Sequence, residues 1–88
     1  MILLKTRRYR RSSAKLPRKI QHLLFRQEKL LAENIFNPKL HTKKLKMQLE
    51  ERIFSFRITR EYRGLFRIEK NEIILFEIGE RKDIYRSF

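Results

Sequence analysis

The chain has 88 residues, and its 23 lysines and arginines against 10 aspartates and glutamates give a net charge of +13 at pH 7. This length predicts a single domain, residues 1–88, that buries roughly 60–65% of the surface of the unfolded chain. The absence of cysteine excludes a disulfide framework and is compatible with a reducing compartment. The location expected for the protein is cytoplasmic. With two isolated histidines and two glycines, a zinc site and a glycine-rich phosphate loop are disfavoured, and no metal or cofactor is expected.

The first half of the chain predicts one strand, two helices and a loop. Met1–Thr6 is short and apolar, which favours a strand, and it is too short for a signal peptide or a membrane span. The spacing of apolar and small residues predicts a short helix over Arg7–Lys15 with Thr6 as its N-cap. An apolar stripe at helical spacing predicts a second helix over Pro17–Glu33, begun by its proline. The stripe consists of Leu16, Ile20, Leu23, Leu24, Leu30 and Leu31. The polar, basic segment Lys39–Glu51 is predicted to be a connecting loop.

Three strand-like runs, 52–59, 62–69 and 72–81, are separated by short polar breaks, which predicts an antiparallel meander. Side chains alternate across a strand, so one face of the meander is apolar and suited to packing against the helices. That face is predicted to hold Phe54, Phe56, Ile58, Tyr62, Gly64, Phe66, Ile68, Ile74, Phe76 and Ile78. The opposite face carries Arg57, Arg63 and Arg67, which are expected to converge on a concave patch with Arg81 and Tyr85 near its rim.

The one-sided charge favours a polyanionic partner. No carboxylate precedes Glu28, whereas lysines and arginines recur throughout the stretch before it. Such a field attracts nucleic acid and speeds encounter with it. Nucleic acid is the leading candidate, and an acidic protein partner does not exclude it. A membrane surface is disfavoured because no broad exposed apolar face lies opposite the cations. A charged surface that only keeps the protein soluble would not require so large an excess.

Several short motifs then carry a resemblance that covers nearly the whole chain. They are Lys44-Leu45-Lys46, Phe54-Ser-Phe-Arg-Ile-Thr59, Glu61-Tyr-Arg-Gly-Leu-Phe-Arg67, Ile78-Gly79 and Ile84-Tyr85-Arg86, with Lys15-Leu16-Pro17 and Asn37-Pro38 upstream. In this order and spacing the sequence resembles the RelE/ParE superfamily of bacterial toxins. The resemblance implies an α+β fold with the order β-α-α-β-β-β, in which a helical hairpin packs on one face of a twisted antiparallel sheet.

The resemblance also implies a function and partners. Members are toxins of type II toxin–antitoxin systems, neutralised in a hetero-oligomer by an antitoxin whose toxin-binding segment is usually acidic. RelE-type members are endoribonucleases that cleave mRNA on the ribosome, whereas ParE-type members inhibit DNA gyrase. The nuclease is the function expected here; the alternatives are a gyrase inhibitor, a relative that has lost catalysis, or a small basic RNA-binding module without toxicity.

The residues expected to carry the chemistry follow from the same resemblance. The catalytic candidates are Arg63, Arg57, Arg81, Tyr85 and Lys43, and the RNA-binding candidates are Lys44, Lys46, Arg60, Arg67, Arg7, Arg8, Arg10 and Arg11. Arginine suits these roles because its guanidinium matches phosphate oxygens and stays charged. The simpler interpretation of Arg57 and Arg63 is that they are surface cations paired with nearby glutamates.

The chain also departs from the family at positions that matter for acid–base chemistry. Arg81 stands where many relatives have a histidine as general acid, and Lys43 stands where others have a glutamate or histidine as base. Ile53 and Ser55 stand where RelE has two lysines. Lys43 could act as a base if surrounding positive charge lowered its pKa, but a plain phosphate contact is the favoured interpretation.

Overall fold

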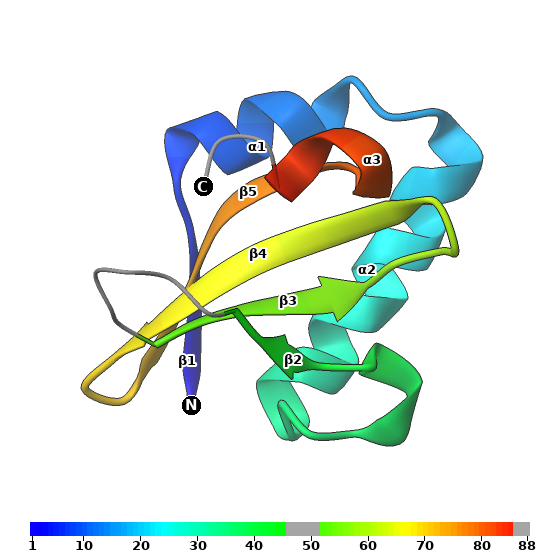
Figure 1. The fold of residues 1–88 in the computed structure, drawn as a ribbon. Helices are drawn as coiled ribbons and strands as arrows, with labels where there is room; N and C mark the ends of the chain where they lie inside the picture. The colour runs from blue at the N-terminus through cyan, green and yellow to red at the C-terminus, as the bar shows by residue number, and fades with distance from the viewer. Residues whose placement is uncertain (46–51, 86–88) are drawn as a thin grey trace.

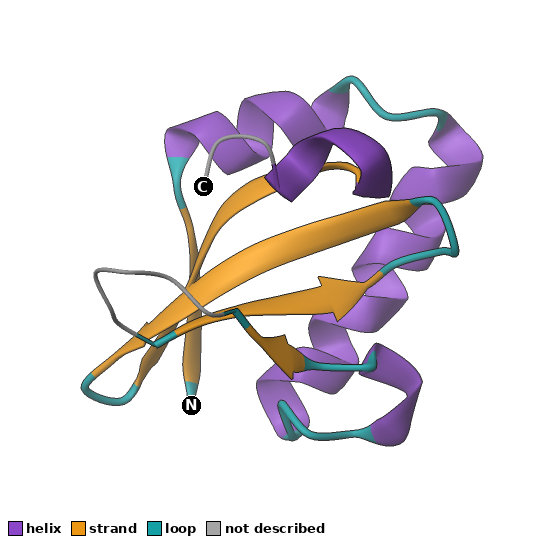
Figure 2. Ribbon diagram, in the orientation of Figure 1, coloured by secondary structure: helices purple, strands orange, loops and turns teal. Residues whose placement is uncertain are grey.

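The computed structural model describes residues 1–45 and 52–85. These residues form a five-stranded sheet in the order β1-β5-β4-β3-β2 (Figure 1). The strands are β1 (Ile2–Lys5), β2 (Lys43–Lys44), β3 (Ile53–Arg57), β4 (Tyr62–Glu69) and β5 (Glu72–Glu80). The helices are α1 (Arg7–Ala14), α2 (Arg18–Glu33) and α3 (Arg81–Ile84), with one 3-10 turn over Pro38–Leu40. The predicted α+β class and the first strand, helical pair and meander are confirmed (Figure 2).

The sheet is mixed, which corrects the expectation of a wholly antiparallel one. β3, β4 and β5 pair antiparallel, but β1 pairs parallel with β5, Ile2 opposite Glu72 and Lys5 opposite Leu75. Strands joined by tight turns must alternate in direction, whereas β1 is separated from the meander by two helices and is free to pair in parallel. A further strand, β2, lies within the segment Lys39–Glu51, which was predicted to be a loop. This strand pairs with β3.

Local signals in the sequence place the two long helices. The Thr6 hydroxyl caps α1 by accepting a hydrogen bond from the Tyr9 backbone N–H at 3.1 Å. Pro17 is the N-cap of α2, where its missing N–H costs nothing because the first helical N–H groups have no intrahelical partner. Leu24 and Leu31 of α2 are buried, and the other members of the predicted stripe pack partly buried against the same core.

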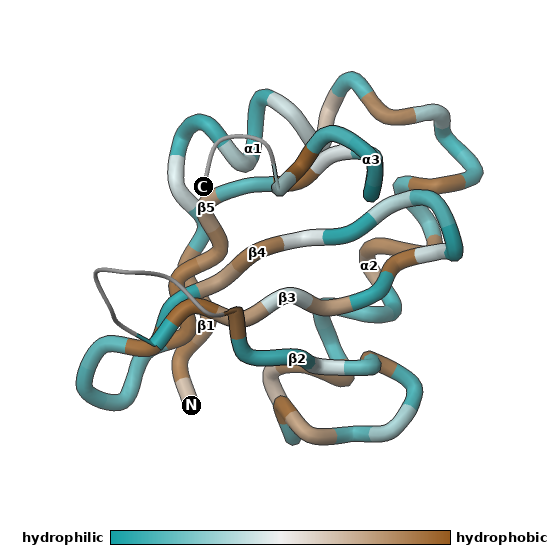
Figure 3. The backbone as a smooth tube through the Cα atoms, in the orientation of Figure 1, coloured by the Kyte–Doolittle hydropathy of each residue, from teal (hydrophilic) through white to brown (hydrophobic). Residues whose placement is uncertain are grey.

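The core lies between these helices and one face of the sheet. Tyr9, Leu24 and Leu31 from the helices meet Phe56 and Phe66 from the sheet in one cluster. Figure 3 shows the contrast in composition, since α1 is largely hydrophilic along the tube whereas β5 is largely hydrophobic. Gly64 lies directly under the Phe56 ring, where a Cβ atom would come within 2.3 Å of a ring carbon.

A β-bulge changes the face that β5 presents to the core. Leu65 pairs with Glu77 but the next residue, Phe66, pairs with Leu75, so Phe76 is the extra residue. Ile73 and Leu75 therefore belong to the core cluster before the bulge, and Ile78 belongs to it after the bulge. The prediction that Ile74, Phe76 and Ile78 face the core is therefore correct for Ile78 and wrong for Ile74 and Phe76.

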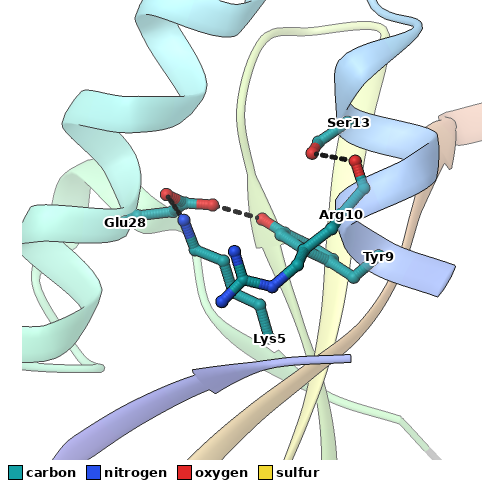
Figure 4. Close-up of polar contacts among 5 residues, drawn as sticks. All are labelled: Lys5, Tyr9, Arg10, Ser13 and Glu28. Atoms are coloured by element: carbon teal, nitrogen blue, oxygen red, sulfur yellow. Dashed lines mark hydrogen bonds and ion pairs between the residues drawn. The ribbon is translucent and has the colours of Figure 1, made fainter. Parts of the chain in front are cut away.

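A buried polar cluster joins β1, α1 and α2 (Figure 4). The Tyr9 hydroxyl donates a hydrogen bond to Glu28 Oε2 at 2.8 Å, and Lys5 Nζ forms an ion pair with Glu28 Oε1 at 2.9 Å. Burial, followed by the charge of Glu28 and the hydrogen bond to it, raises the pKa of Tyr9 well above its usual range. The cluster therefore ties the first strand to both helices through a single carboxylate.

Candidate functional site

Two rows of residues run across the sheet on the face opposite the core. In one row, Arg57 of β3 lies opposite Arg63 of β4. In the other, Ser55 lies between Lys43 of β2 and Leu65 of β4. The antiparallel pairing therefore brings Lys43 and Arg63 close together although 20 positions of sequence separate them. Residues directly opposite one another in an antiparallel pair share a face, which aims these side chains to the same side.

The short helix α3 completes the site from the end of β5. The Arg81 backbone N–H donates a hydrogen bond to the Glu61 carbonyl at 2.6 Å, which fixes the start of α3 against the turn between β3 and β4. Ile84 is buried, and α3 packs against β4 and β5, so the face predicted to lie open is partly covered. In Figure 1, α3 crosses in front of the upper end of β5. This placement presents Arg81 and the exposed ring of Tyr85 beside the arginine row.

A cleft of about 270 Å³ opens between these elements. The described residues that line it are Lys43, Leu45, Arg63, Arg81 and Tyr85. Three of them carry positive charge, and none of these lining residues is acidic. Four of the five residues predicted to be catalytic thus border one cleft, and the fifth, Arg57, is the direct cross-strand partner of Arg63. A negatively charged group of the size of a phosphate fits the charge and the scale of this cleft.

A second cleft of about 830 Å³ shares two lining residues with the first. It is lined by Arg60, Glu61, Glu80, Arg81, Lys82 and Tyr85. Arg81 and Tyr85 therefore stand between the two clefts. Arg60, predicted to bind RNA, belongs to this second cleft, whereas Glu61, Glu80 and Lys82 were not predicted from the sequence. These three residues lie at the ends or just outside the strands, where the sequence shows no periodic pattern that would single them out.

Other predicted residues lie apart from the clefts. Arg67 pairs with Glu69 at 2.8 Å and lies over the Phe76 ring, 5.6 Å from its centroid. Because Arg67 is four residues beyond Arg63 along β4, about 13 Å at the rise of a strand, it does not join the predicted convergence of three guanidiniums. Lys44 is exposed on β2, and Lys46 lies outside the described residues.

The basic residues of the first helix form a separate surface, which we call the α1 basic surface. It consists of Arg7, Arg8, Arg10 and Arg11, all exposed. Arg8 forms an ion pair with Glu77 of β5 at 2.8 Å, in keeping with the packing of α1 along β5. The α1 basic surface is therefore held by the N-terminal helix and does not line either cleft.

No group of three or more histidine, aspartate or glutamate side chains within the described ranges is placed to hold a metal ion. Among the helices of residues 1–45 and 52–85, none is long and apolar enough to cross a membrane. The side chains that line the smaller cleft offer the cations of Lys43, Arg63 and Arg81 and the phenol of Tyr85.

Comparison with solved structures defines the class of fold. The chain has the fold of the RelE/ParE-like toxins, matched over nearly its full length. The YoeB/ParE toxin from Agrobacterium tumefaciens superposes with a TM-score of 0.77 at 15% identity, covering 92% of this chain and 99% of that chain. RelE in the RelB–RelE antitoxin–toxin complex from Methanococcus jannaschii gives 0.75 at 20% identity, with 97% and 98% covered.

YafQ from E. coli is similar to the same extent, with a TM-score of 0.74 at 10% identity and coverage of 94% of this chain and 96% of that chain. By sequence, no protein-family model and no curated protein matches the chain. The likeness therefore lies in the backbone, and the roles of individual side chains must be argued from the site itself.

Proposed function

We propose that this protein is the toxin of a toxin–antitoxin pair and that it cleaves mRNA on the ribosome. The observation that carries the proposal is the cleft in which Lys43, Arg63 and Arg81 surround a space of about 270 Å³ with Tyr85 at its edge. The fold supports the toxin role by its likeness to RelE, YoeB and YafQ. The net charge of +13 supports a polyanionic substrate.

The chemistry proposed is attack of a ribose 2′-hydroxyl on the adjacent phosphate. The bond from phosphorus to the 5′-oxygen of the next nucleotide breaks, and a 2′,3′-cyclic phosphate forms, while the proton of the 2′-hydroxyl passes to water and the departing 5′-oxygen takes a proton from water. The phosphorane gains negative charge as it forms, and cations fixed beforehand stabilise that charge without reorganising. In this scheme Arg63 and Lys43 contact the non-bridging oxygens, and Arg81 stabilises the leaving oxygen. Arg57 strengthens the positive field from the neighbouring position on β3.

Tyr85 is assigned to the nucleotide rather than to the phosphate. Its ring stands between the two clefts and is exposed, so that an unstacked base can lie against it. The larger cleft, with Arg60 and Lys82 among its walls, then takes the neighbouring nucleotide. The α1 basic surface and Lys44 supply contacts to ribosomal RNA away from the reacting phosphate.

The partners follow from the same proposal. A RelE toxin is seen with its RelB antitoxin in the Methanococcus jannaschii complex, and we extend such a pairing to this chain. An antitoxin with an acidic toxin-binding segment matches the positive charge of the protein. Phe25 on α2 is exposed and offers an apolar anchor for such a segment on the helical pair.

The test is cleavage of a defined mRNA on purified translating ribosomes. Arg63→Ala should lower the cleavage rate about 100-fold, the usual effect of removing one preorganised donor at a developing oxyanion. Arg26→Ala, which removes an exposed arginine of α2, is the matched control and should cut at the wild-type rate. If the wild-type protein leaves mRNA intact but inhibits purified gyrase, the gyrase-inhibitor alternative replaces the nuclease.

A further inference from the structure

Two buried polar groups beneath the smaller cleft have no hydrogen-bond partner within the described part of the chain. They are the Ser55 hydroxyl and the Nε–H of Arg63. Ser55 is wholly buried, with 0% of its surface exposed. Buried polar groups in folded proteins are nearly always paired, so an unpaired donor and an unpaired acceptor on neighbouring strands require an explanation.

The strand register places these two groups as diagonal neighbours. Ser55 lies opposite Leu65, and Arg63 is two residues before Leu65 on the same strand. Because side chains alternate along a strand, Ser55 and Arg63 project from the same face of the sheet. Diagonal neighbours of this kind are about 7–8 Å apart at their Cα atoms, within reach of a long side chain such as arginine.

The burial of Nε also determines which edge of Arg63 can meet a ligand. A guanidinium presents donors on two edges, one that includes Nε–H and one formed by the two terminal nitrogens. The Nε atom is inaccessible, whereas Arg63 as a whole is only half buried and lines the cleft. A phosphate in the cleft therefore meets the terminal nitrogens, and Nε–H must find its acceptor within the protein.

We propose that Ser55 is the positioning residue for Arg63: its Oγ accepts a hydrogen bond from Arg63 Nε–H when a phosphate engages the terminal nitrogens. The inference rests on the proposed function, in which Arg63 binds the scissile phosphate. The hydroxyl fixes the rotation of the guanidinium, so its fork is already aligned when charge develops on the phosphorane.

The kinetic arm of the test compares Ser55→Ala with wild type on purified ribosomes. Loss of a partner that orients a binding group typically costs about 10–100-fold, so kcat should fall roughly tenfold while KM for ribosomes stays unchanged. In an Arg63→Lys background, which has no Nε–H, Ser55→Ala should add no further loss. Ser13→Ala, a serine of α1, is the matched control. A structural role alone predicts the wild-type rate for Ser55→Ala and overturns the inference.

A second arm does not depend on cleavage. The exchange of the Arg63 Nε–H proton with water is followed by NMR while inorganic phosphate is added. In the wild type and in Ser13→Ala, phosphate should slow this exchange, and in Ser55→Ala it should not. Exchange that phosphate leaves unchanged in the wild type, or slows equally in Ser55→Ala, overturns the inference. A protein that shows this coupling but does not cut mRNA would refute the nuclease proposal and leave Ser55 as the positioning residue of an anion site.

Discussion

Removing one hydroxyl from the buried polar cluster should lower stability without disturbing the packing around it. Tyr9 has 0% of its surface exposed, and its hydroxyl supplies one oxygen of Glu28 with a hydrogen bond while Lys5 supplies the other. Tyr9→Phe keeps the ring in place, so it opens no cavity of the size of a side chain. It leaves Glu28 Oε2 without the donor seen in Figure 4.

The magnitude follows from the charge of the acceptor. A hydrogen bond to a charged group contributes about 1.5–3 kcal/mol, more than a bond between neutral groups, and a buried carboxylate cannot replace it readily with water. For a domain of this size each kcal/mol changes the Tm by about 4–8 °C. We therefore expect Tyr9→Phe to melt roughly 8–16 °C below the wild type for a loss of about 2 kcal/mol.

The assay is thermal and urea unfolding of the wild type, Tyr9→Phe and the matched control Tyr62→Phe. Tyr62 packs only partly buried against the core, so its variant should stay close to the wild type. Equal melting temperatures for Tyr9→Phe and wild type would refute the reasoning. The same outcome would mean that the cluster contributes no net free energy in spite of its short distances.

The same hydroxyl predicts a pH dependence. Burial, with Glu28 beside it, raises the pKa of Tyr9 in the folded state above the ordinary value of about 10 that holds when unfolded. Above pH ~10 the unfolded chain therefore releases a proton that the folded chain retains, and stability falls by up to ~1.4 kcal/mol per pH unit. Below pH ~10 this contribution is fully present. Tyr9→Phe should lack this additional alkaline loss, and parallel stability curves above pH ~10 would contradict the assignment.

Two further predictions concern packing and charge. Gly64→Ala places a Cβ within 2.3 Å of the Phe56 ring and should destabilise the fold by about 1–3 kcal/mol. Gly79→Ala, with nothing within 4 Å of the added Cβ, should be nearly neutral. The urea midpoint of unfolding should therefore fall for Gly64→Ala only, and equal midpoints for the two variants would contradict this. Binding to ribosomes or RNA should weaken steeply with salt, and Arg60→Ala should reduce the slope of log K against log salt by about 0.7–0.9. A flat salt dependence would exclude a phosphate-dominated interface.

Most of the fold could be predicted because its determinants are local. The Thr6 cap, the proline before α2 and the polar breaks of the meander each fix one boundary with a few neighbouring residues. Two of the errors, the missed bulge in β5 and the missed strand β2, lie where the alternation of apolar and polar residues is absent. Ile73–Phe76 is apolar throughout, so it shows no alternation from which to place a bulge. Lys43–Lys44 is polar and exposed, so only its partner β3 makes it a strand.

The sequence predicted most residues of the smaller cleft but not how they come together. The resemblance singled out Lys43, Arg63, Arg81 and Tyr85, but nothing in the chain itself places β2 or α3 beside the meander. The role inferred for Ser55 could not be reached from the sequence, because a serine between two phenylalanines of a strand has no distinguishing pattern. Its lack of a partner becomes visible only when the opposite strands are in register.

The way the cleft is held together explains how like charges can be kept side by side. Lys43, Arg63 and Arg81 come from three different elements, and their mutual repulsion opposes the folded state. Hydrogen bonds to backbone carbonyls hold these elements together against that repulsion. Gln27 of α2 donates hydrogen bonds to the carbonyls of Arg57 and Lys39, at 2.7 Å and 3.0 Å.

The bond from the Arg81 N–H to the Glu61 carbonyl fixes α3 in the same manner. These hydrogen bonds hold the three elements together against the repulsion between the cations. The side chains of Lys43, Arg63 and Arg81 therefore remain available to bind an anion. An anion that enters the cleft then relieves a repulsion already present in the free protein. For this reason we expect inorganic phosphate to raise the melting temperature of the wild type, and to raise it less in Arg63→Ala, where one of the three charges is gone.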